Sequence, residues 1–473
     1  MLLGARITNL WCFQRPLCTK SPRLCAKLTF SSLSDSKVLH SIDADCDDDF
    51  LPWLERKAGV EISSFLSIGK SAYGRSVFAS QKLRTGDCIL KVPFDVQLSQ
   101  DNLRPKIKSL MGDEIGNVAK LAIVILFEQK MGKDSEWAPY ISRLPQAGEM
   151  HNTIFWSEDE LDMIRQSSLF QETVNKKAQI EMEFWAIKPA LESFPEVFNH
   201  IKLKDFMCAY ALAVESRAWR STKGVSLIPF ADFLNHDGLS EAIVLNDEDK
   251  QLSEVIADRN YAPKEEVLIR YGNFSNATLI LDFGFTLPYN RHDEVQIQIK
   301  IPDHDPLREM KLELLQRHCL PSIKDINGFK SSKDSFTIKE VRSAGGKRKG
   351  LPISLRAFAR VLCCSSPQEL CDLAVEAANN DGRLARRPLR NGSQEILAHQ
   401  LLLSQMTQLT EEYNASIKSL DLVTSPSMCK RLSLRKQMAR DLLIGELRVL
   451  ESASAWLENY CTTSAPTFYS CPG

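Results

Sequence analysis

The chain has 473 residues, enough for two or three domains, and its 44% hydrophobic and 25% charged residues are ordinary for a soluble globular protein. Its formal net charge is -1, so neither nucleic acid nor a membrane surface is an expected partner. The longest apolar run, LAIVILF at 121–127, is too short to span a bilayer. The 13 cysteines form no C-x-x-C pair and no zinc-type Cys/His spacing, which predicts reduced thiols and no metal.

The first 45 residues differ in composition from the rest. Between Met1 and Ser34 there are five basic residues and no acidic one, and serines and threonines gather toward the end. This composition is typical of an organellar transit peptide, and it lacks the continuous apolar core of a secretory signal. A disordered basic tail is the alternative. We therefore predict a leader over residues 1–45, whose early Arg6 and apolar start suit a mitochondrion.

The region 46–302 alternates between strand-like and helical segments. A short helix at 51–58 precedes strand-like pieces at 76–80 and 88–94. A helical insert follows at about 100–215, and its clearest helical segments are 118–131, 168–194 and 203–219. Strands return at 241–245, 252–257, 266–271 and 295–301, the last with Val295, Ile297, Ile299 and Ile301 on one face.

Beyond residue 303 the chain is predicted to be helical to about 460, most clearly at 392–409 and 439–460. Basic loops at 345–350 and 383–390 interrupt this part, and we expect a disordered tail at 461–473. The predicted architecture is a strand-rich core, split by a helical insert and followed by a helical domain.

One stretch, LIPFADFLNHDG at 227–238, places polar side chains inside an apolar run. Buried polar groups are costly unless paired, so these side chains either satisfy one another or face a ligand. Asp232 and His236 are four residues apart, but no third ligand with suitable spacing accompanies them, which argues against a metal site. GKS at 69–71 lacks the glycine that a phosphate loop needs at position 64, which argues against a nucleotide triphosphatase.

LIPFADFLNH resembles the asparagine-histidine motif of SET-domain methyltransferases, and its surroundings resemble the Rubisco large-subunit lysine methyltransferase branch. AYGRSVFASQKLRTGDCILKVP is similar to the first glycine-containing segment of that branch, WAPYISRLP and TIFWSEDEL to its insert, and ESRAW to its serine-arginine-aromatic motif. EVLIRYGNFSNATLILDFGF resembles its terminal tyrosine segment. The resemblance covers about residues 50–457, and the motifs are specific as a set in this order.

The resemblance implies an α+β fold: a β-rich, pseudoknotted SET core over 46–302, then an all-helical substrate-binding domain over 303–460. It implies S-adenosyl-L-methionine as cofactor and a protein lysine as acceptor. In-line methyl transfer needs alignment and a dry channel rather than a metal, and an apolar channel beside a sulfonium favours the neutral amine. We expect the enzyme to be a monomer.

The same resemblance assigns roles to individual residues. Tyr271 is the catalytic residue, whose hydroxyl orients the acceptor nitrogen. Arg217 matches the arginine that binds the cofactor carboxylate, and Asp232 either braces the asparagine-histidine turn or faces the substrate channel. The cofactor-binding residues are Ser71, Ala72, Tyr73, Arg217, Asn235, His236 and Phe285. The substrate-binding residues are Ser216, Trp219, Asp232 and Phe283.

Three positions depart from the family pattern. Ala72 stands where the family usually has glycine, which alanine replaces only at negative φ. Phe283 stands where many relatives have tyrosine, so the channel has one hydroxyl fewer and the degree of methylation stays open. Asp237 replaces a small polar residue and is expected to turn the chain. We also expect part of the motif at 227–238 to look under-satisfied without its cofactor.

The sequence therefore predicts a protein-lysine N-methyltransferase that acts on a non-histone organellar protein. One alternative is a protein-histidine N-methyltransferase of the same fold, and another is a non-catalytic SET-fold binding module whose basic loops contact an acidic partner. Rubisco large subunit and fructose-bisphosphate aldolase are candidate substrates by family analogy. The leader composition suits a mitochondrion and the family resemblance suits a plastid.

Overall fold

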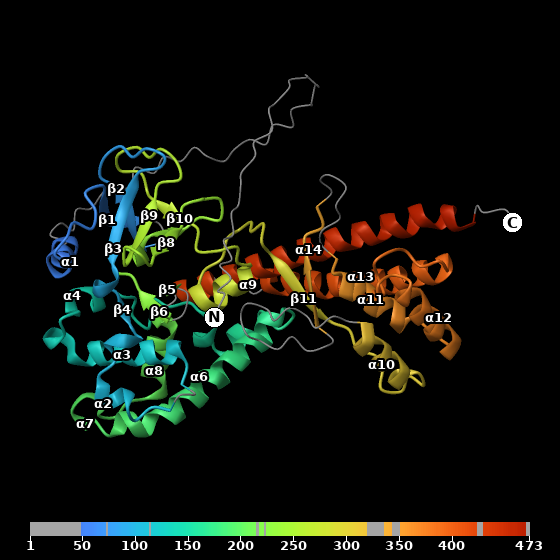
Figure 1. Cartoon of the computed structure of the whole chain (residues 1–473), viewed down its shortest axis with the longest axis horizontal. Helices are drawn as coiled ribbons and strands as arrows, with labels where there is room; N and C mark the ends of the chain where they lie inside the picture. Colours follow the sequence, from blue (N-terminus) through green and yellow to red (C-terminus); the bar gives the residue numbers. More distant parts are fainter. Residues whose placement is uncertain are drawn as a thin grey trace, which may run out of the picture. The chain divides into compact units, whose positions relative to one another are not determined.

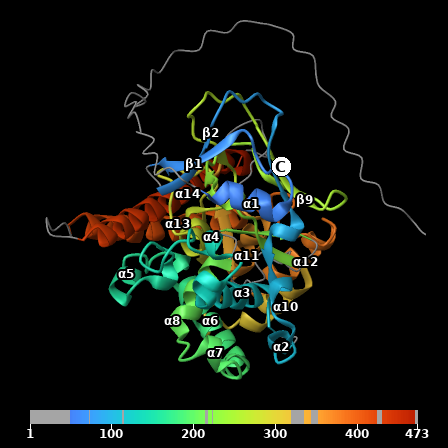
Figure 2. The ribbon, with the colours of Figure 1, turned by 90° about the vertical axis from the view of Figure 1, so that its left-hand side faces the viewer.

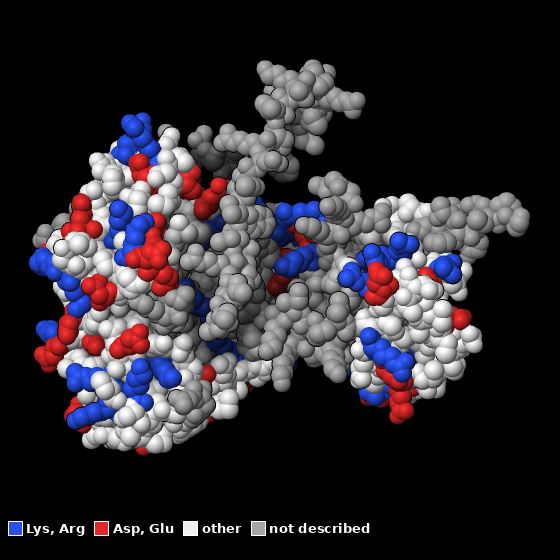
Figure 3. Space-filling view, in the orientation of Figure 1, with Lys and Arg blue, Asp and Glu red and all other residues white. Residues whose placement is uncertain are grey.

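The computed structural model describes residues 49–71, 74–112, 115–213, 217–221, 224–318, 335–342, 351–422 and 429–469. The predicted leader at 1–45 and the basic loop at 345–350 lie outside the described residues. No helix in the described ranges is long and apolar enough to cross a membrane. Lys and Arg are interspersed with Asp and Glu over the described part of the face in Figure 3, in keeping with the net charge of -1.

The described part begins with α1 (Phe50–Ala58), which ends at Gly59 in the left-handed conformation, with φ of 67°. A hairpin of β1 (Leu66–Ser71) and β2 (Gly74–Ala79) follows, antiparallel from Leu66↔Ala79 to Ser71↔Gly74. A second sheet has the order β3-β9-β8, with β3 (Cys88–Pro93), β9 (Leu252–Ile256) and β8 (Val244–Asp247). These strands lie where short β-branched segments are predicted.

The insert is helical as predicted. It contains α2 (Pro105–Lys108), α3 (Asn117–Met131), α4 (Ala138–Ile141), α5 (Glu158–Asp162), α6 (Ser168–Glu192), α7 (Pro195–Phe198) and α8 (Leu203–Ala213). α3 is buried from Leu121 to Phe127, which explains its long apolar run. Helices α1 and α4 lie together in both views of the ribbon (Figures 1 and 2), so the chain before the sheets packs on the insert.

One predicted helix was too long. The segment 203–219 was expected to be helical throughout, but α8 ends at Ala213, and Ala218 and Trp219 lie on β5 (Ala218–Ser221). β5 pairs antiparallel with β6 (Gly224–Leu227), which also pairs with β4 (Leu98–Ser99). Pairing with a strand later in the chain overrides the local helical pattern at this point.

Two further strands are only two residues long. β7 (Asn235–His236) and β10 (Leu268–Ile269) run parallel, with Leu268 opposite Asn235 and Ile269 opposite His236. The segment 266–271 was predicted as one strand, but β10 covers only its centre, and Glu266 forms a separate antiparallel bridge with Phe78. This short ladder brings the motif at 227–238 beside the segment that contains Tyr271.

After β10 the chain forms α9 (Asn276–Thr278), a π-helical turn (Leu279–Phe283), β11 (Glu294–Gln298) and α10 (Arg308–His318). Purely helical structure was expected beyond residue 303, but β12 (Ser335–Lys339) pairs antiparallel with β11. Val295 and Ile297 on β11 and Phe336 and Ile338 on β12 are buried, so the alternating pattern at 295–301 is completed by a strand from the next domain.

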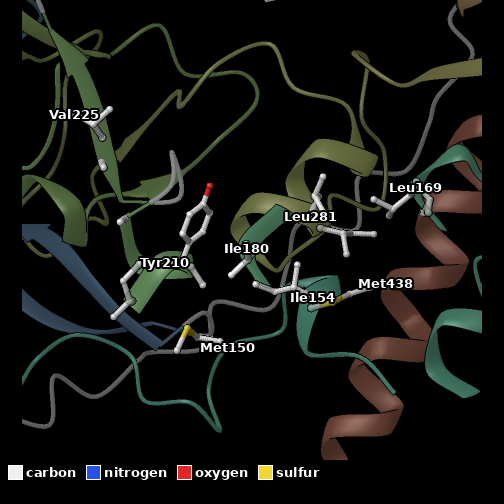
Figure 4. Packing of buried hydrophobic residues seen from close by; sticks show 14 of the residues in the cluster. Met150, Ile154, Leu169, Ile180, Tyr210, Val225, Leu281 and Met438 are labelled. Atoms are coloured by element: carbon white, nitrogen blue, oxygen red, sulfur yellow. The ribbon is translucent and has the colours of Figure 1, made fainter. Parts of the chain in front are cut away.

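The helical domain continues with α11 (Ile353–Leu362), α12 (Pro367–Ala378), α13 (Gly392–Leu422) and α14 (Lys430–Tyr469). A disordered tail was predicted from 461, but α14 continues to Tyr469. The absence of glycine and proline from residues 446–465 favours helix over most of this segment, and Pro466 lies near its end. Buried residues of the insert and of the helical domain belong to one cluster, in which Figure 4 shows Ile154, Ile180 and Leu281 with Met438 of α14.

Candidate active site

The chain enters the site through a strained turn at Phe230, which has φ of 75° and ψ of -45°. Non-glycine residues rarely adopt this conformation, and it persists only where packing enforces it. Phe230 is fully buried, and its ring stacks 6.5 Å from that of Phe50 on α1. The turn starts the 3₁₀ segment Ala231–Phe233, which presents Asp232 to the interior.

Asp232 lies at the centre of a buried polar cluster. Its Oδ2 atom accepts a hydrogen bond from the hydroxyl of Tyr140 at 2.9 Å, and Arg217 Nη1 lies 3.5 Å from the same oxygen. Arg217 Nη1 also donates to the main-chain carbonyl of Asp232 at 3.0 Å. Burial raises the pKa of the Asp232 carboxyl to about 6, although the Arg217 charge and the Tyr140 hydrogen bond both oppose the rise.

The β7–β10 ladder places Asn235 and His236 next to the tyrosine segment. Asn235 Nδ2 lies 3.3 Å from both the Arg75 carbonyl and the Glu266 Oε1 atom. His236 Nδ1 accepts a hydrogen bond from the Tyr271 main-chain N–H at 3.1 Å. Burial lowers the pKa of His236 despite neighbouring Asp237, so its imidazole is neutral at pH 7. Because Nδ1 accepts a hydrogen bond, the ring proton is on Nε2.

The Tyr271 hydroxyl is fixed by the chain segment it faces. It donates a hydrogen bond of 2.6 Å to the carbonyl of Leu234, one residue before Asn235. Burial raises the pKa of Tyr271 well above its ordinary value, which keeps the phenol neutral. Its ring stacks on Phe283 at 5.3 Å and meets Phe285 edge-on at 6.5 Å. The hydroxyl hydrogen is therefore used in this bond. The ring of Tyr271 lies against those of Phe283 and Phe285, which form an aromatic wall.

Gly284 sets the position of this wall. It has φ of 76° and follows the π-helical turn, and a Cβ atom there would lie 2.9 Å from the main-chain nitrogen of Asn152. The Asn152 amide donates to the carbonyls of Leu281 and Asp282 at 3.2 and 2.6 Å. The insert therefore holds the turn that carries Phe283 and Phe285. Only glycine fits at position 284, where this turn meets the main chain of the insert.

The structure brings most of the predicted site residues together. Arg217 contacts Asp232, and both charges act on the Tyr271 phenol. His236, Tyr271, Phe283 and Phe285 contact one another, and Asn235 precedes His236 on β7. Ser71 lies at the end of β1, whereas Ala72, Tyr73 and Ser216 lie outside the described residues. Trp219 lies on β5 opposite Ser226 and, within the described ranges, makes no ring contact with the Tyr271 wall.

The expected roles within the motif at 227–238 are now specific. Asp237 turns the chain, since its Oδ1 accepts from the Leu239 N–H at 2.9 Å. Of the two roles open for Asp232, bracing fits the contacts with Tyr140 and Arg217. Asn235 and His236 have protein partners, so the predicted under-satisfaction is confined to Asp232 Oδ1, which is buried without a hydrogen-bond partner.

Sequence reasoning missed several supporting residues. Tyr140 was noted only as part of the insert motif WAPYISRLP, and Arg75, Glu266 and Asn152 were not singled out. A tyrosine in an apolar run is most often a core residue, so its pattern gives no signal of a distant polar partner. In the described part of the chain, no group of three or more His, Cys, Asp or Glu residues is arranged to hold a metal ion.

Comparison with known families accounts for this arrangement. The family model for the SET domain matches residues 74–272, and the model described as Rubisco LSMT substrate-binding matches residues 302–450. The matches, with the fold, define the class: the chain contains a SET domain. This domain is followed by a second one of the Rubisco LSMT substrate-binding type.

Curated relatives span two kinds of acceptor. The chain is 24% identical over 419 residues to the chloroplastic [fructose-bisphosphate aldolase]-lysine N-methyltransferase of Arabidopsis thaliana, covering 85% of this chain and 81% of that one. It is 26% identical over 324 residues to the chloroplastic Rubisco large-subunit N-methyltransferase of Pisum sativum, covering 63% of each. It is 24% identical over 430 residues to the human actin-histidine N-methyltransferase, covering 86% of this chain and 67% of that one.

Solved structures show the same fold. Rubisco LSMT bound to sinefungin and monomethyllysine has a TM-score of 0.68 with this chain at 21% identity, covering 88% of this chain and 92% of that one. Rubisco LSMT bound to AdoMet has a TM-score of 0.65 at the same identity and coverage. The expectation of a SET core followed by a helical domain is confirmed.

Proposed function

We propose that this chain is an S-adenosyl-L-methionine-dependent protein-lysine N-methyltransferase that acts on a non-histone organellar protein. The observation that carries the proposal is the Tyr271 hydroxyl, held at 2.6 Å by the Leu234 carbonyl against the Phe283 and Phe285 rings. Arg217, Asn235 and His236 lie on the neighbouring segments. These groups match, one by one, what methyl transfer from a sulfonium to an amine requires.

The residues present fit the cofactor. Among the described residues, the Nη2 and Nε atoms of Arg217 have no hydrogen-bond partner, so two donors of a guanidinium remain for a carboxylate. Asn235 supplies an amide, and neutral His236 keeps a second positive charge away from a sulfonium. When bound, the cofactor supplies an electrophilic methyl group. We propose Ser71, Ala72, Tyr73 and Phe285 as further cofactor contacts.

The acceptor side of the site is apolar and oriented. The Phe283 and Phe285 rings exclude water around a lysine side chain, which favours its neutral, nucleophilic form. The Tyr271 hydroxyl donates its hydrogen bond to the Leu234 carbonyl. Its oxygen can therefore accept a hydrogen bond from the amine. That bond directs the nitrogen lone pair along the transfer axis. Ser216, Trp219 and Phe283 are proposed to line the acceptor side, whereas the contacts of Asp232 with Tyr140 and Arg217 fit the bracing role.

Relatives suggest where to look for the acceptor. The names of two N-methyltransferase relatives give fructose-bisphosphate aldolase and the Rubisco large subunit as substrates, and both relatives are chloroplastic. We therefore propose a plastid protein of this kind as the first substrate to test. A mitochondrial protein is the alternative that the leader composition supports.

A histidine acceptor is the second candidate, since the human relative is named for actin-histidine methylation. A neutral imidazole needs a polar partner to hold its tautomer. Phe283 offers no hydroxyl for this purpose, which favours lysine. Acid hydrolysis of the labelled product followed by amino-acid analysis separates methyl-lysine from methyl-histidine.

Cofactor binding is the first test. Calorimetric titration of S-adenosylmethionine should give a binding curve with the wild-type chain, whereas Arg217→Ala should weaken binding because the carboxylate loses its guanidinium. Arg84→Ala, at an exposed arginine outside the site, is the matched control and should bind like wild type. Absence of binding by the wild-type chain would contradict any methyltransferase function.

The chemistry is tested with Tyr271→Phe. Plastid and mitochondrial extracts are incubated with labelled cofactor and enzyme, and labelled proteins are identified by mass spectrometry. We expect Tyr271→Phe to bind cofactor normally but to lower the transfer rate roughly 10²-fold, because the amine is no longer oriented. Unchanged turnover by this variant would mean that Tyr271 has no catalytic role.

A further inference from the structure

Tyr140 connects the helical insert to the site but takes no part in the proposed methyl transfer. It lies in α4 and is fully buried. Its ring belongs to an aromatic cluster with Phe50, Trp137 and Phe233, at ring-centroid distances of 6.1, 6.5 and 6.4 Å. This packing leaves the hydroxyl little freedom to move, and burial raises the pKa of Tyr140 well above its ordinary value, so it remains a neutral donor.

The hydroxyl of Tyr140 controls the geometry of one carboxylate oxygen. It donates to Asp232 Oδ2 at 2.9 Å, and the same oxygen faces Arg217 Nη1 at 3.5 Å. The Asp232 side chain is fully buried, and its Oδ1 atom has no partner. The Tyr140 hydroxyl therefore makes the shorter of the two described contacts to Oδ2, 2.9 Å against 3.5 Å for Arg217 Nη1.

Arg217 is bound directly to this carboxylate and to the main chain beside it. Its described hydrogen bonds all go to Asp232 through Nη1. A buried carboxylate and a carbonyl on one nitrogen fix the plane of the guanidinium. The remaining donors are then aimed in one direction before any ligand arrives.

We propose that Tyr140 is a positioning residue for the cofactor: it holds Asp232, Asp232 holds Arg217, and the aligned guanidinium binds the carboxylate of an amino-acid-type cofactor. The inference rests on the proposed function, because it takes Arg217 as the carboxylate ligand. It adds that cofactor affinity depends on a hydrogen bond made entirely inside the protein. Pre-organisation of this kind lowers the ordering cost of binding.

The arrangement predicts a pH dependence with a definite sign. The groups that face Asp232 are Arg217, Tyr140 on α4 and Arg75 on β2, and all three favour its ionised form, whereas burial raises its pKa to about 6. The cofactor carboxylate stays ionised throughout this range. Binding should therefore be strongest above about pH 6 and weaken as the pH falls through the pKa of Asp232. Removing the Tyr140 hydroxyl should raise that pKa and move the loss of binding to higher pH.

The test uses the full chain and calorimetric titration of S-adenosylhomocysteine between pH 5.5 and 8. For Tyr140→Phe we expect the Kd at pH 8 to rise roughly three- to tenfold, since a hydrogen bond to a charged group is lost, with an upward shift of the pH midpoint. Asp232→Asn keeps the size of the side chain and should bind weakly at every pH. A purely structural role for Tyr140 would not shift the midpoint.

Tyr261→Phe is the matched control, because Tyr261 is also buried and also donates to an aspartate, Asp258, at 2.7 Å, but has no contact with Arg217. It should leave both Kd and the pH profile unchanged. Unaltered or tighter binding by Tyr140→Phe, or wild-type affinity in Asp232→Asn, would overturn the inference. If the wild-type chain itself fails to bind, the proposed function fails and the inference fails with it.

Discussion

Arg435 on α14 is a buried cation that fastens the helical domain to the insert, and its replacement by methionine should strongly destabilise the protein. Its Nη1 atom donates to Glu160 Oε2 at 2.6 Å and to the Phe155 carbonyl at 3.1 Å. Only 3% of the Arg435 side chain and 7% of the Glu160 side chain are exposed. Methionine keeps an apolar stem in the same space but removes the charge and the donors.

The expected cost follows from what Arg435→Met leaves behind. Glu160 keeps its hydrogen bond from the Ser157 N–H at 2.8 Å and the influence of the Arg431 charge, but it loses the buried cation that pairs with it directly. Removing one partner of a buried ion pair costs about 3–5 kcal/mol, because the desolvation of the other charge is no longer offset. We expect a decrease of that size in the free energy of unfolding, measured by urea denaturation followed by circular dichroism.

Two further variants decide between this reasoning and a simple packing effect. The double variant Arg435→Met with Glu160→Gln should be more stable than Arg435→Met alone, since no uncompensated charge remains. Arg165→Met, which breaks an exposed pair with Asp162, should cost no more than about 1 kcal/mol. A loss below about 1 kcal/mol for Arg435→Met, or strictly additive losses in the double variant, would refute the reasoning.

Three further outcomes follow from buried groups and backbone geometry. Burial, with Asp293 and Glu172 nearby, raises the pKa of Glu446 to about 8, so its contribution to stability is full below its ordinary pKa and is lost as the pH rises toward 8. In the wild-type protein the unfolding free energy should fall between pH 5 and 8, and Glu446→Gln should reduce this slope by about 1.4 kcal/mol per pH unit. The exposed control Glu451→Gln should keep the wild-type slope. Equal slopes for Glu446→Gln and the wild type would contradict the reasoning. Gly284→Ala should destabilise the protein by more than Gly59→Ala. Both positions have positive φ, but only at position 284 would the added Cβ meet backbone atoms. Equal melting temperatures of the two variants would exclude this clash. Phe283→Tyr adds a hydroxyl to the acceptor side and should change the ratio of mono- to trimethylated product in mass spectra, whereas an unchanged ratio would remove Phe283 from the acceptor side.

Long helices were predictable because their signal is local. α3, α6 and α13 contain continuous or periodic apolar residues, and the only proline or glycine in their interiors is Pro189, near the end of α6. The strands that build the site are different. β7 and β10 have two residues each, so no alternation can be read from them, and each exists because the other lies beside it. β12 was missed for the same reason, since its partner β11 belongs to the preceding domain.

The site residues show the same difference between local and distant signals. Arg217, Asn235, His236 and Tyr271 were found because their motifs resemble those of a known family, and the structure brings these segments into contact. The partners that fix them carry no such signal. Tyr140 and Asp232 are separated by 92 positions, and neither the apolar run around Tyr140 nor the motif around Asp232 indicates the other.

The buried polarity of LIPFADFLNHDG has a physical explanation that joins these two observations. Three polar side chains of the motif have partners from other parts of the chain: Tyr140 from the insert for Asp232, Glu266 for Asn235 and the Tyr271 segment for His236. A low-dielectric interior strengthens these bonds and penalises any that is missing. The site can therefore form only when the insert, β7 and β10 are assembled together. Its geometry is consequently a property of the whole SET domain, which is why the motifs of the sequence indicated Asp232, Asn235 and His236 but not Tyr140 and Glu266, which hold two of them.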